Sequence, residues 1–190
     1  GAYLDIIGYS PDSRYFAFEQ YGVQDGSGFP YADIFIVDLV SNSWVKGTPI
    51  RERLDDEEAR IATAHRAAMA RAEPLLQALA INEPAAIIAS NPSGEVLAER
   101  GRITFDRWYR SSGPSSPDNN EMPEIRYELR VGTVDLPQAD GCPDDMGKTV
   151  GLTVSLKRVS TGKVTEIHRD TSLPKSRGCA TGYDIDTVVA

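Results

Sequence analysis

The sequence predicts an α+β fold: an antiparallel β-meander, a central helical insertion and a C-terminal antiparallel β-sheet. Three observations support this fold. Aromatic and β-branched runs separated by turn residues fill residues 3–46, apolar residues recur every three to four positions over 52–81, and strand-like runs return after 84. We therefore expect a single domain over residues 1–190, divided into a meander (1–50), a helical segment (51–82) and a β-rich part (83–190).

The meander is predicted from four apolar runs and the turns between them. Ser10-Pro11-Asp12-Ser13 is typical of a type I turn because proline occupies its second position. Three glycines mark a long hairpin loop over residues 22–30. The predicted strands are Tyr3–Tyr9, Arg14–Tyr21, Ala32–Val40 and Trp44–Lys46.

The helical segment is predicted over residues 52–81. Asp55, Asp56, Glu57 and Glu58 would occupy its first turn, where carboxylates interact favourably with the helix dipole. With Glu52, these residues could also be read as an acid/base cluster, but a solvated first turn does not separate their pKa values. Pro74 is expected to break the helix and begin a second one that ends near Ile81.

The rest of the chain is predicted to be β-sheet. Residues 111–120 are rich in Ser, Pro and Asn and are expected to form a surface loop. Ser160-Thr161-Gly162 would join two strands in a hairpin. The predicted strands are Ala85–Ala89, Glu95–Glu99, Arg102–Tyr109, Ile125–Val134, Lys148–Arg158, Lys163–Arg169 and Tyr183–Val189.

Charge and motifs exclude several functions. The formal net charge is −8, which argues against nucleic-acid or anionic-lipid binding because both need a basic surface. The chain has no apolar stretch long enough to span a membrane. We find no nucleophile elbow or phosphate loop and expect no catalytic motif, cofactor or metal. Asp135, Asp140, Asp144 and Asp145 could bind calcium, but a solvated acidic loop is the favoured interpretation.

The glycine-rich loop is the candidate ligand- or partner-binding site. It combines backbone N–H groups, a carboxylate and two aromatic rings, and loops held by a rigid sheet often carry function. The alternative is a hairpin whose glycines only adopt positive φ. The candidate residues are Asp25, Gly26, Ser27, Gly28, Phe29 and Tyr31.

Two resemblances are visible in the sequence. Residues 9–18, followed by Asp33-Ile34-Phe35-Ile36-Val37-Asp38, resemble one blade of a WD40-like (TolB-type) propeller, although that family usually has glycine where Ser13 stands. One copy is too little for a propeller. The run from Tyr9 to Val45, together with Asp140-Gly141-Cys142-Pro143 and Gly182-Tyr183-Asp184-Ile185, resembles DUF2259, a family of predicted secreted bacterial proteins.

The DUF2259 resemblance implies a signal peptide and a periplasmic location, but no assigned activity. A chain that starts at Gly1 without a leader fits a mature secreted protein. Secretion and the loop setting of both cysteines favour a Cys142–Cys179 disulfide, worth about 4 kcal/mol in the chain-entropy model. Two free thiols in a cytosolic protein are the alternative.

These observations favour a non-enzymatic envelope module that binds a protein or a glycan through its sheet and glycine-rich loop. The alternative is a periplasmic hydrolase of an envelope polymer. Its carboxylate pair would join Asp33 or Asp38 to Glu19 or Asp184. A third possibility is a protein that lends an edge strand to a partner.

Overall fold

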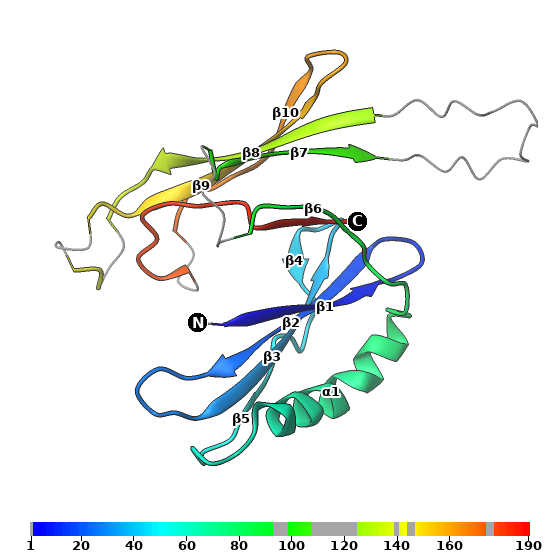
Figure 1. The fold of residues 1–190 in the computed structure, drawn as a ribbon, viewed down its shortest axis with the longest axis vertical. Coiled ribbons are helices and arrows are strands. Elements are labelled where there is room, and N and C mark those ends of the chain that lie inside the picture. Colours follow the sequence, from blue (N-terminus) through cyan, green and yellow to red (C-terminus); the bar gives the residue numbers. More distant parts are fainter. Residues whose placement is uncertain (1, 93–98, 108–124, 139–140, 144–146, 174–176) are drawn as a thin grey trace, which may run out of the picture. The chain divides into compact units, whose positions relative to one another are not determined.

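The computed structural model describes residues 2–92, 99–107, 125–138, 141–143, 147–173 and 177–190. These residues form mostly antiparallel β-sheet with one α-helix, which agrees with the predicted α+β class (Figure 1). The chain divides into two compact units, Gly1–Ala86 and Ile87–Ala190. The expectation of a single domain over 1–190 stays a prediction.

The sheet of the first unit follows the predicted strand order. Strands β1 (Tyr3–Tyr9), β2 (Tyr15–Val23) and β3 (Pro30–Asp38) pair consecutively and antiparallel. Strands β4 (Ser43–Trp44) and β5 (Ile50–Arg53) each pair with β3. β3 is therefore the central strand, and its burial alternates along its whole length.

One face of this sheet packs against helix α1 (Ile61–Ala78), which runs beside β3 and β5 (Figure 1). Small side chains on the helix let its backbone approach the sheet closely, and burial of the apolar strand residues drives this packing. The fully buried residues of this core are Ala17, Ala32, Ile34, Ile36, Ala64, Ala68 and Ala72.

The beginning of the predicted helix is wrong. Helix α1 starts at Ile61 after Arg60 as N-cap and has no acidic residue in its first turn, so the expected dipole role of residues 55–58 is also wrong. Residues 50–53 instead form β5, where Ile50 is buried opposite Ile34. Backbone bonds to the free edge of β3 override the helical preference of this charged segment.

The predicted helix break at Pro74 is wrong as well, because α1 continues through this residue. Pro74 and Ala70, the residue four positions earlier, are both exposed, so water can bond to the carbonyl that the proline leaves free. Ala72 and Leu76 are buried on either side of Pro74. Their packing against the sheet holds one continuous helix.

Gly8 occupies a position in β1 that an alanine would strain. Its φ is +145°, it lies at a β-bulge, and a Cβ there would be 2.4 Å from the Glu83 carbonyl oxygen. The next residue, Tyr9, donates a 2.8 Å backbone bond to that same oxygen, so the carbonyl cannot easily move.

Gly8→Ala is therefore expected to lower the free energy of unfolding by about 1–3 kcal/mol, measured by urea denaturation. Gly47→Ala is the matched control, because Gly47 also has a positive φ of +92° but a Cβ added to it would meet no atom within 4 Å. A loss no larger for Gly8→Ala than for Gly47→Ala would contradict the steric argument.

The second unit contains two sheets. Strands β7 (Arg102–Arg107), β8 (Ile125–Asp135), β9 (Val150–Arg158) and β10 (Val164–Arg169) pair antiparallel in the order β10-β9-β8-β7. Strand β6 (Ile87–Ser90) pairs with β11 (Thr187–Val189), which is shorter than predicted. Most of the expected strand Glu95–Glu99, and the expected loop 111–120, lie outside the described residues.

A buried carboxylate ties the segment after β10 to strand β9. Asp170 accepts hydrogen bonds from the Leu152 backbone N–H at 2.6 Å, from His168 Nε2 at 2.8 Å, and from Arg177. Burial pushes the pKa of Asp170 upward, but these three donors together hold it below its usual value. The ionised form of Asp170 thus holds the loop at Arg177 in place.

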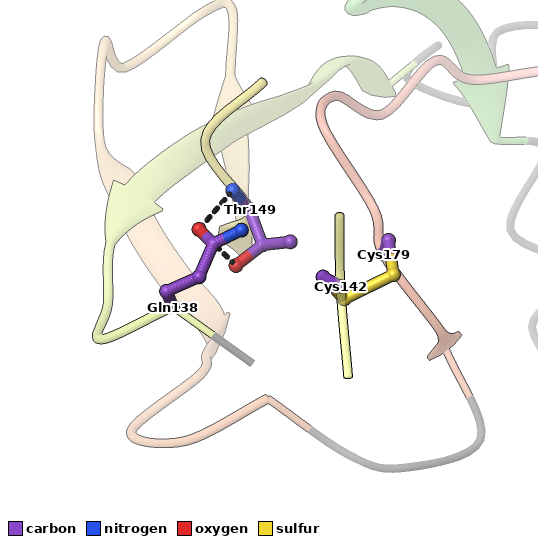
Figure 2. Close-up of a disulfide and its surroundings, with 4 residues drawn as sticks. All are labelled: Gln138, Cys142, Thr149 and Cys179. Atoms are coloured by element: carbon purple, nitrogen blue, oxygen red, sulfur yellow. Dashed lines mark hydrogen bonds between the residues drawn. A yellow bond between two sulfur atoms is a disulfide. The ribbon is translucent and has the colours of Figure 1, made fainter. Parts of the chain in front are cut away.

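The predicted disulfide between Cys142 and Cys179 is present, with a Cα–Cα distance of 5.6 Å (Figure 2). Beside it, Gln138 Oε1 accepts bonds from the backbone N–H and the hydroxyl of Thr149, at 3.1 and 3.2 Å (Figure 2). Two independent connections therefore fasten the segment between β8 and β9.

Candidate functional site

An open pocket of about 720 Å³ lies in the first unit, where β3, β5 and the glycine-rich loop meet. Pockets with a few converging polar groups are the usual places for ligands in proteins. The residues that line it are Ala2, Val23, Gln24, Asp25, Tyr31, Asp33, Arg51, Glu52, Arg53 and Asp55.

Strand register positions the polar side chains of the pocket. Tyr31 lies opposite Arg53, and Asp33 lies opposite Arg51, in the antiparallel pair of β3 and β5. Since alternate residues of a strand share a face, Tyr31 and Asp33 project from the face of β3 that does not pack on α1. The pocket wall is thus built on hydrogen-bonded strands, which keeps it rigid.

The glycine-rich loop closes the end of this wall. Gln24 N–H donates to the Phe29 carbonyl at 2.9 Å, and Gly28 N–H donates to the Gln24 carbonyl at 3.0 Å. Gly26 and Gly28 have φ values of +89° and +71°, a conformation that glycine adopts readily. The loop is therefore a tight hairpin that carries Asp25 near its start.

The structure separates the six predicted site residues into two groups. Asp25 and Tyr31 line the pocket, whereas Gly26, Ser27, Gly28 and Phe29 do not. The Ser27 hydroxyl donates to the Gln24 side chain at 3.2 Å, which shapes the loop instead of facing a ligand. Sequence reasoning missed Arg51 and Arg53 and considered Asp33 only as a hydrolase carboxylate, because only the register of β3 and β5 brings these residues beside Tyr31.

Most charged groups around the pocket are paired. Arg53 contacts Asp55 at 2.8 Å, Arg51 lies 3.6 Å from Asp33, and Arg71 of α1 contacts Glu52 at 2.6 Å. No described residue donates a hydrogen bond to the Asp25 carboxylate, and none forms an ion pair with it. Asp25 is therefore the surplus negative charge of the pocket.

Asp33 is a partly buried carboxyl group of the pocket wall. Burial raises its pKa, and the charge of Arg51 opposes that shift only in part. Asp33 consequently keeps its proton to a higher pH than an exposed aspartate does.

Within the first unit, the carboxylates expected for a hydrolase occupy different surroundings. Glu19 pairs with Ile34 in the register of β2 and β3 and so lies on the helix face, opposite to Asp33. Asp38 is bound by Arg14 at 2.9 Å, and this hydrogen bond holds the pKa of Asp38 below its usual range. Asp184 belongs to the second unit.

Buried Glu19 pairs with the partly exposed His65, a contact that sequence reasoning did not find. The Glu19 side chain is 1% exposed, and its Oε2 lies 2.7 Å from His65 Nδ1 on α1. Its other oxygen, Oε1, is buried and has no hydrogen-bond partner among the described residues. The available signal was Glu19 itself, since it shares the helix-facing side of β2 with Ala17.

Other candidate groups offer less. Among the described residues, no group of three or more His, Cys, Asp or Glu side chains could hold a metal ion. Asp135 pairs with Lys148 at 3.1 Å, and the other predicted calcium ligands, Asp140, Asp144 and Asp145, lie outside the described residues. Within the described part of the chain, no helix has the length and apolar character needed to cross a membrane.

A second depression, of about 650 Å³, lies in the second unit. Its charged groups are engaged with one another, since Arg102 lies 3.0 Å from Glu99 and 3.6 Å from Glu128. Asn91 is buried and donates to the Arg102 carbonyl at 3.3 Å. This depression therefore offers fewer free polar groups to a ligand than the first pocket does.

Comparison with known families places the chain in one of them. The model of the family DUF2259, described as a predicted secreted protein, matches residues 17–190. A match over this share of the chain shows membership: the fold and pocket described here belong to a secreted protein. The chain is a member of DUF2259. No curated protein matches it, and the WD40-like blade, the signal peptide and the periplasmic location stay predictions.

Proposed function

We propose that this protein is a non-enzymatic binding module of the bacterial envelope and that its pocket binds a glycan. The observation that carries the proposal is the convergence of Asp25 and Tyr31 with Asp33, Arg51 and Arg53 around one open pocket. The wall of that pocket lies on paired strands, which suits a preorganised binding site.

The chemistry of the lining suits a sugar. Carboxylates, guanidinium groups and the Gln24 amide provide the donors and acceptors that sugar hydroxyls need, and the Tyr31 ring offers an apolar surface for a pyranose. Because the pocket is open, a longer chain can pass through it. An envelope protein presenting a polar loop is the other partner class that this surface fits.

An envelope location is supported by two observations. The family is described as predicted secreted, and the Cys142–Cys179 disulfide is of the kind that persists in oxidising compartments such as the periplasm.

The consecutive antiparallel pairing of β1, β2 and β3 supports a blade-like meander at 1–50 as the scaffold of the site.

The test is a pulldown of soluble envelope glycans, followed by titration calorimetry of the captured fraction. Tyr31→Ala and Asp25→Asn are each expected to weaken binding. For Tyr31→Ala, the loss of one packed aromatic ring predicts a decrease in affinity of about fivefold to tenfold. Glu58→Gln is the matched control, because Glu58 is an exposed carboxylate that does not line the pocket. Unchanged binding by the Tyr31→Ala, Asp25→Asn double variant would overturn the proposal.

The raised pKa of Asp33 favours hydrolysis of the same glycan as a second function, since a general acid needs a carboxyl group whose pKa lies above the ordinary value. Asp25 would then be the partner carboxylate. Release of shorter saccharides during the calorimetric incubation, abolished in Asp33→Asn, would favour the hydrolase over the binding module.

A further inference from the structure

The charge balance of the pocket indicates which kind of sugar it takes. Three of its carboxylates already face a guanidinium group: Asp33 faces Arg51, Asp55 faces Arg53, and Glu52 faces Arg71. Asp25 faces none of the described cations, although it lines the same pocket. A pocket with one surplus carboxylate attracts a cation.

Tyr31 supplies a second feature that favours a cation. It lines the pocket together with Asp25, and it lies on β3 just after the loop that carries Asp25. The face of a tyrosine ring attracts an ammonium group through its quadrupole. A carboxylate and an aromatic ring in one pocket therefore suit a positively charged nitrogen better than a neutral hydroxyl.

The two arginines of the lining do not cancel this preference. Arg51 and Arg53 each form an ion pair with a carboxylate of the pocket, at 3.6 and 2.8 Å, which reduces the positive charge that either presents to a ligand. An anionic sugar would have to displace Asp33 or Asp55 from its arginine, and it would meet Asp25 as a like charge. A sugar acid is thus disfavoured.

We infer that the pocket recognises a free ammonium group on its glycan, that is, an amino sugar without an N-acyl group, through Asp25 and Tyr31. This inference rests on the proposed glycan-binding function. The ammonium donates to the Asp25 carboxylate, while the ring of Tyr31 contacts the same group or the adjoining sugar face. Asp33, Arg51 and Arg53 bind the neutral hydroxyls.

Calorimetry with three defined tetrasaccharides tests the inference: β-1,4-linked glucosamine, its fully N-acetylated form and neutral cellotetraose. We expect the glucosamine tetramer to bind about tenfold more tightly than the other two, from one ion pair and one cation–π contact. Asp25→Asn is expected to weaken glucosamine binding about fivefold and to weaken binding of the other two tetramers less, so the amine preference is lost. Because Asp25 is exposed, added salt should reduce the same difference.

Three further results have distinct meanings. Equal affinity for the three tetramers, or an Asp25→Asn variant that keeps the amine preference, would overturn the inference and leave glycan binding in place. In a second result, envelope glycans bind in a way that depends on Tyr31 while the glucosamine tetramer does not bind. That result would overturn the amino-sugar inference and leave the proposed glycan-binding function in place. If neither envelope glycans nor any tetramer binds the wild-type chain, the proposed function itself falls. Glu58→Gln, the control outside the pocket, should bind as the wild type does.

Discussion

Replacing Glu19 by methionine should stabilise the protein by about 1–4 kcal/mol. The Glu19 carboxylate is 1% exposed, and one of its oxygens has no hydrogen-bond partner among the described residues. It also lies directly across from Asp5 in the register of β1 and β2, where like charges oppose each other. Methionine matches the length of glutamate, fills the same space between sheet and helix, and carries no group that must be desolvated.

Truncating the other member of the pair should have the opposite effect. His65→Ala leaves the buried Glu19 carboxylate without its 2.7 Å partner, and we expect a loss of about 1–3 kcal/mol. In the background of Glu19→Met, the same His65→Ala change should cost much less, because the histidine no longer has a carboxylate to satisfy.

Equilibrium urea denaturation of the four proteins in this double-mutant cycle measures both effects. Glu58→Met is the matched control: it makes the same substitution at an exposed loop position and should change stability little. A Glu19→Met variant that is destabilised by as much as His65→Ala would contradict the prediction, since it would show that the contact with His65 outweighs the cost of burying the Glu19 carboxylate. A stabilised Glu19→Met variant would mark Glu19 as a residue kept for a reason other than stability.

Removing the disulfide should destabilise the second unit by about 4 kcal/mol. Cys142 and Cys179 are 37 positions apart, so the bond closes a long loop and removes many conformations from the unfolded chain. The variant that tests this prediction combines Cys142→Ser with Cys179→Ser, which leaves no free thiol.

Hydrogen exchange of the β8 and β9 amides, combined with urea denaturation, measures this loss. Dithiothreitol should destabilise the wild type by a similar amount and have no further effect on the double serine variant, which makes the reductant an internal control. Equal midpoints for wild type and variant would contradict the prediction. In that case the Gln138–Thr149 bonds and the Asp170–Arg177 pair would suffice to hold the connecting segments.

The sequence by itself determined the local elements of this protein. The apolar and aromatic runs of Tyr3–Tyr9 and Tyr15–Val23, and the alternating pattern of Ile125–Asp135, are properties of each segment alone, so these strands were predictable to within a few residues. The family could be identified for the same reason, because each of its motifs consists of residues that are neighbours in the sequence. The two cysteines and their loops also allowed the disulfide to be predicted before any distance was known.

Only the tertiary structure decided which distant residues meet. The free edge of β3 captured residues 50–53 as a strand, and packing against the sheet carried α1 through Pro74. The register of β3 and β5 assembled the pocket, and the face alternation of β2 placed Glu19 under His65. Periodicity is a local signal, whereas pairing between residues far apart in the chain depends on which packing buries the most apolar surface and satisfies the most backbone hydrogen bonds.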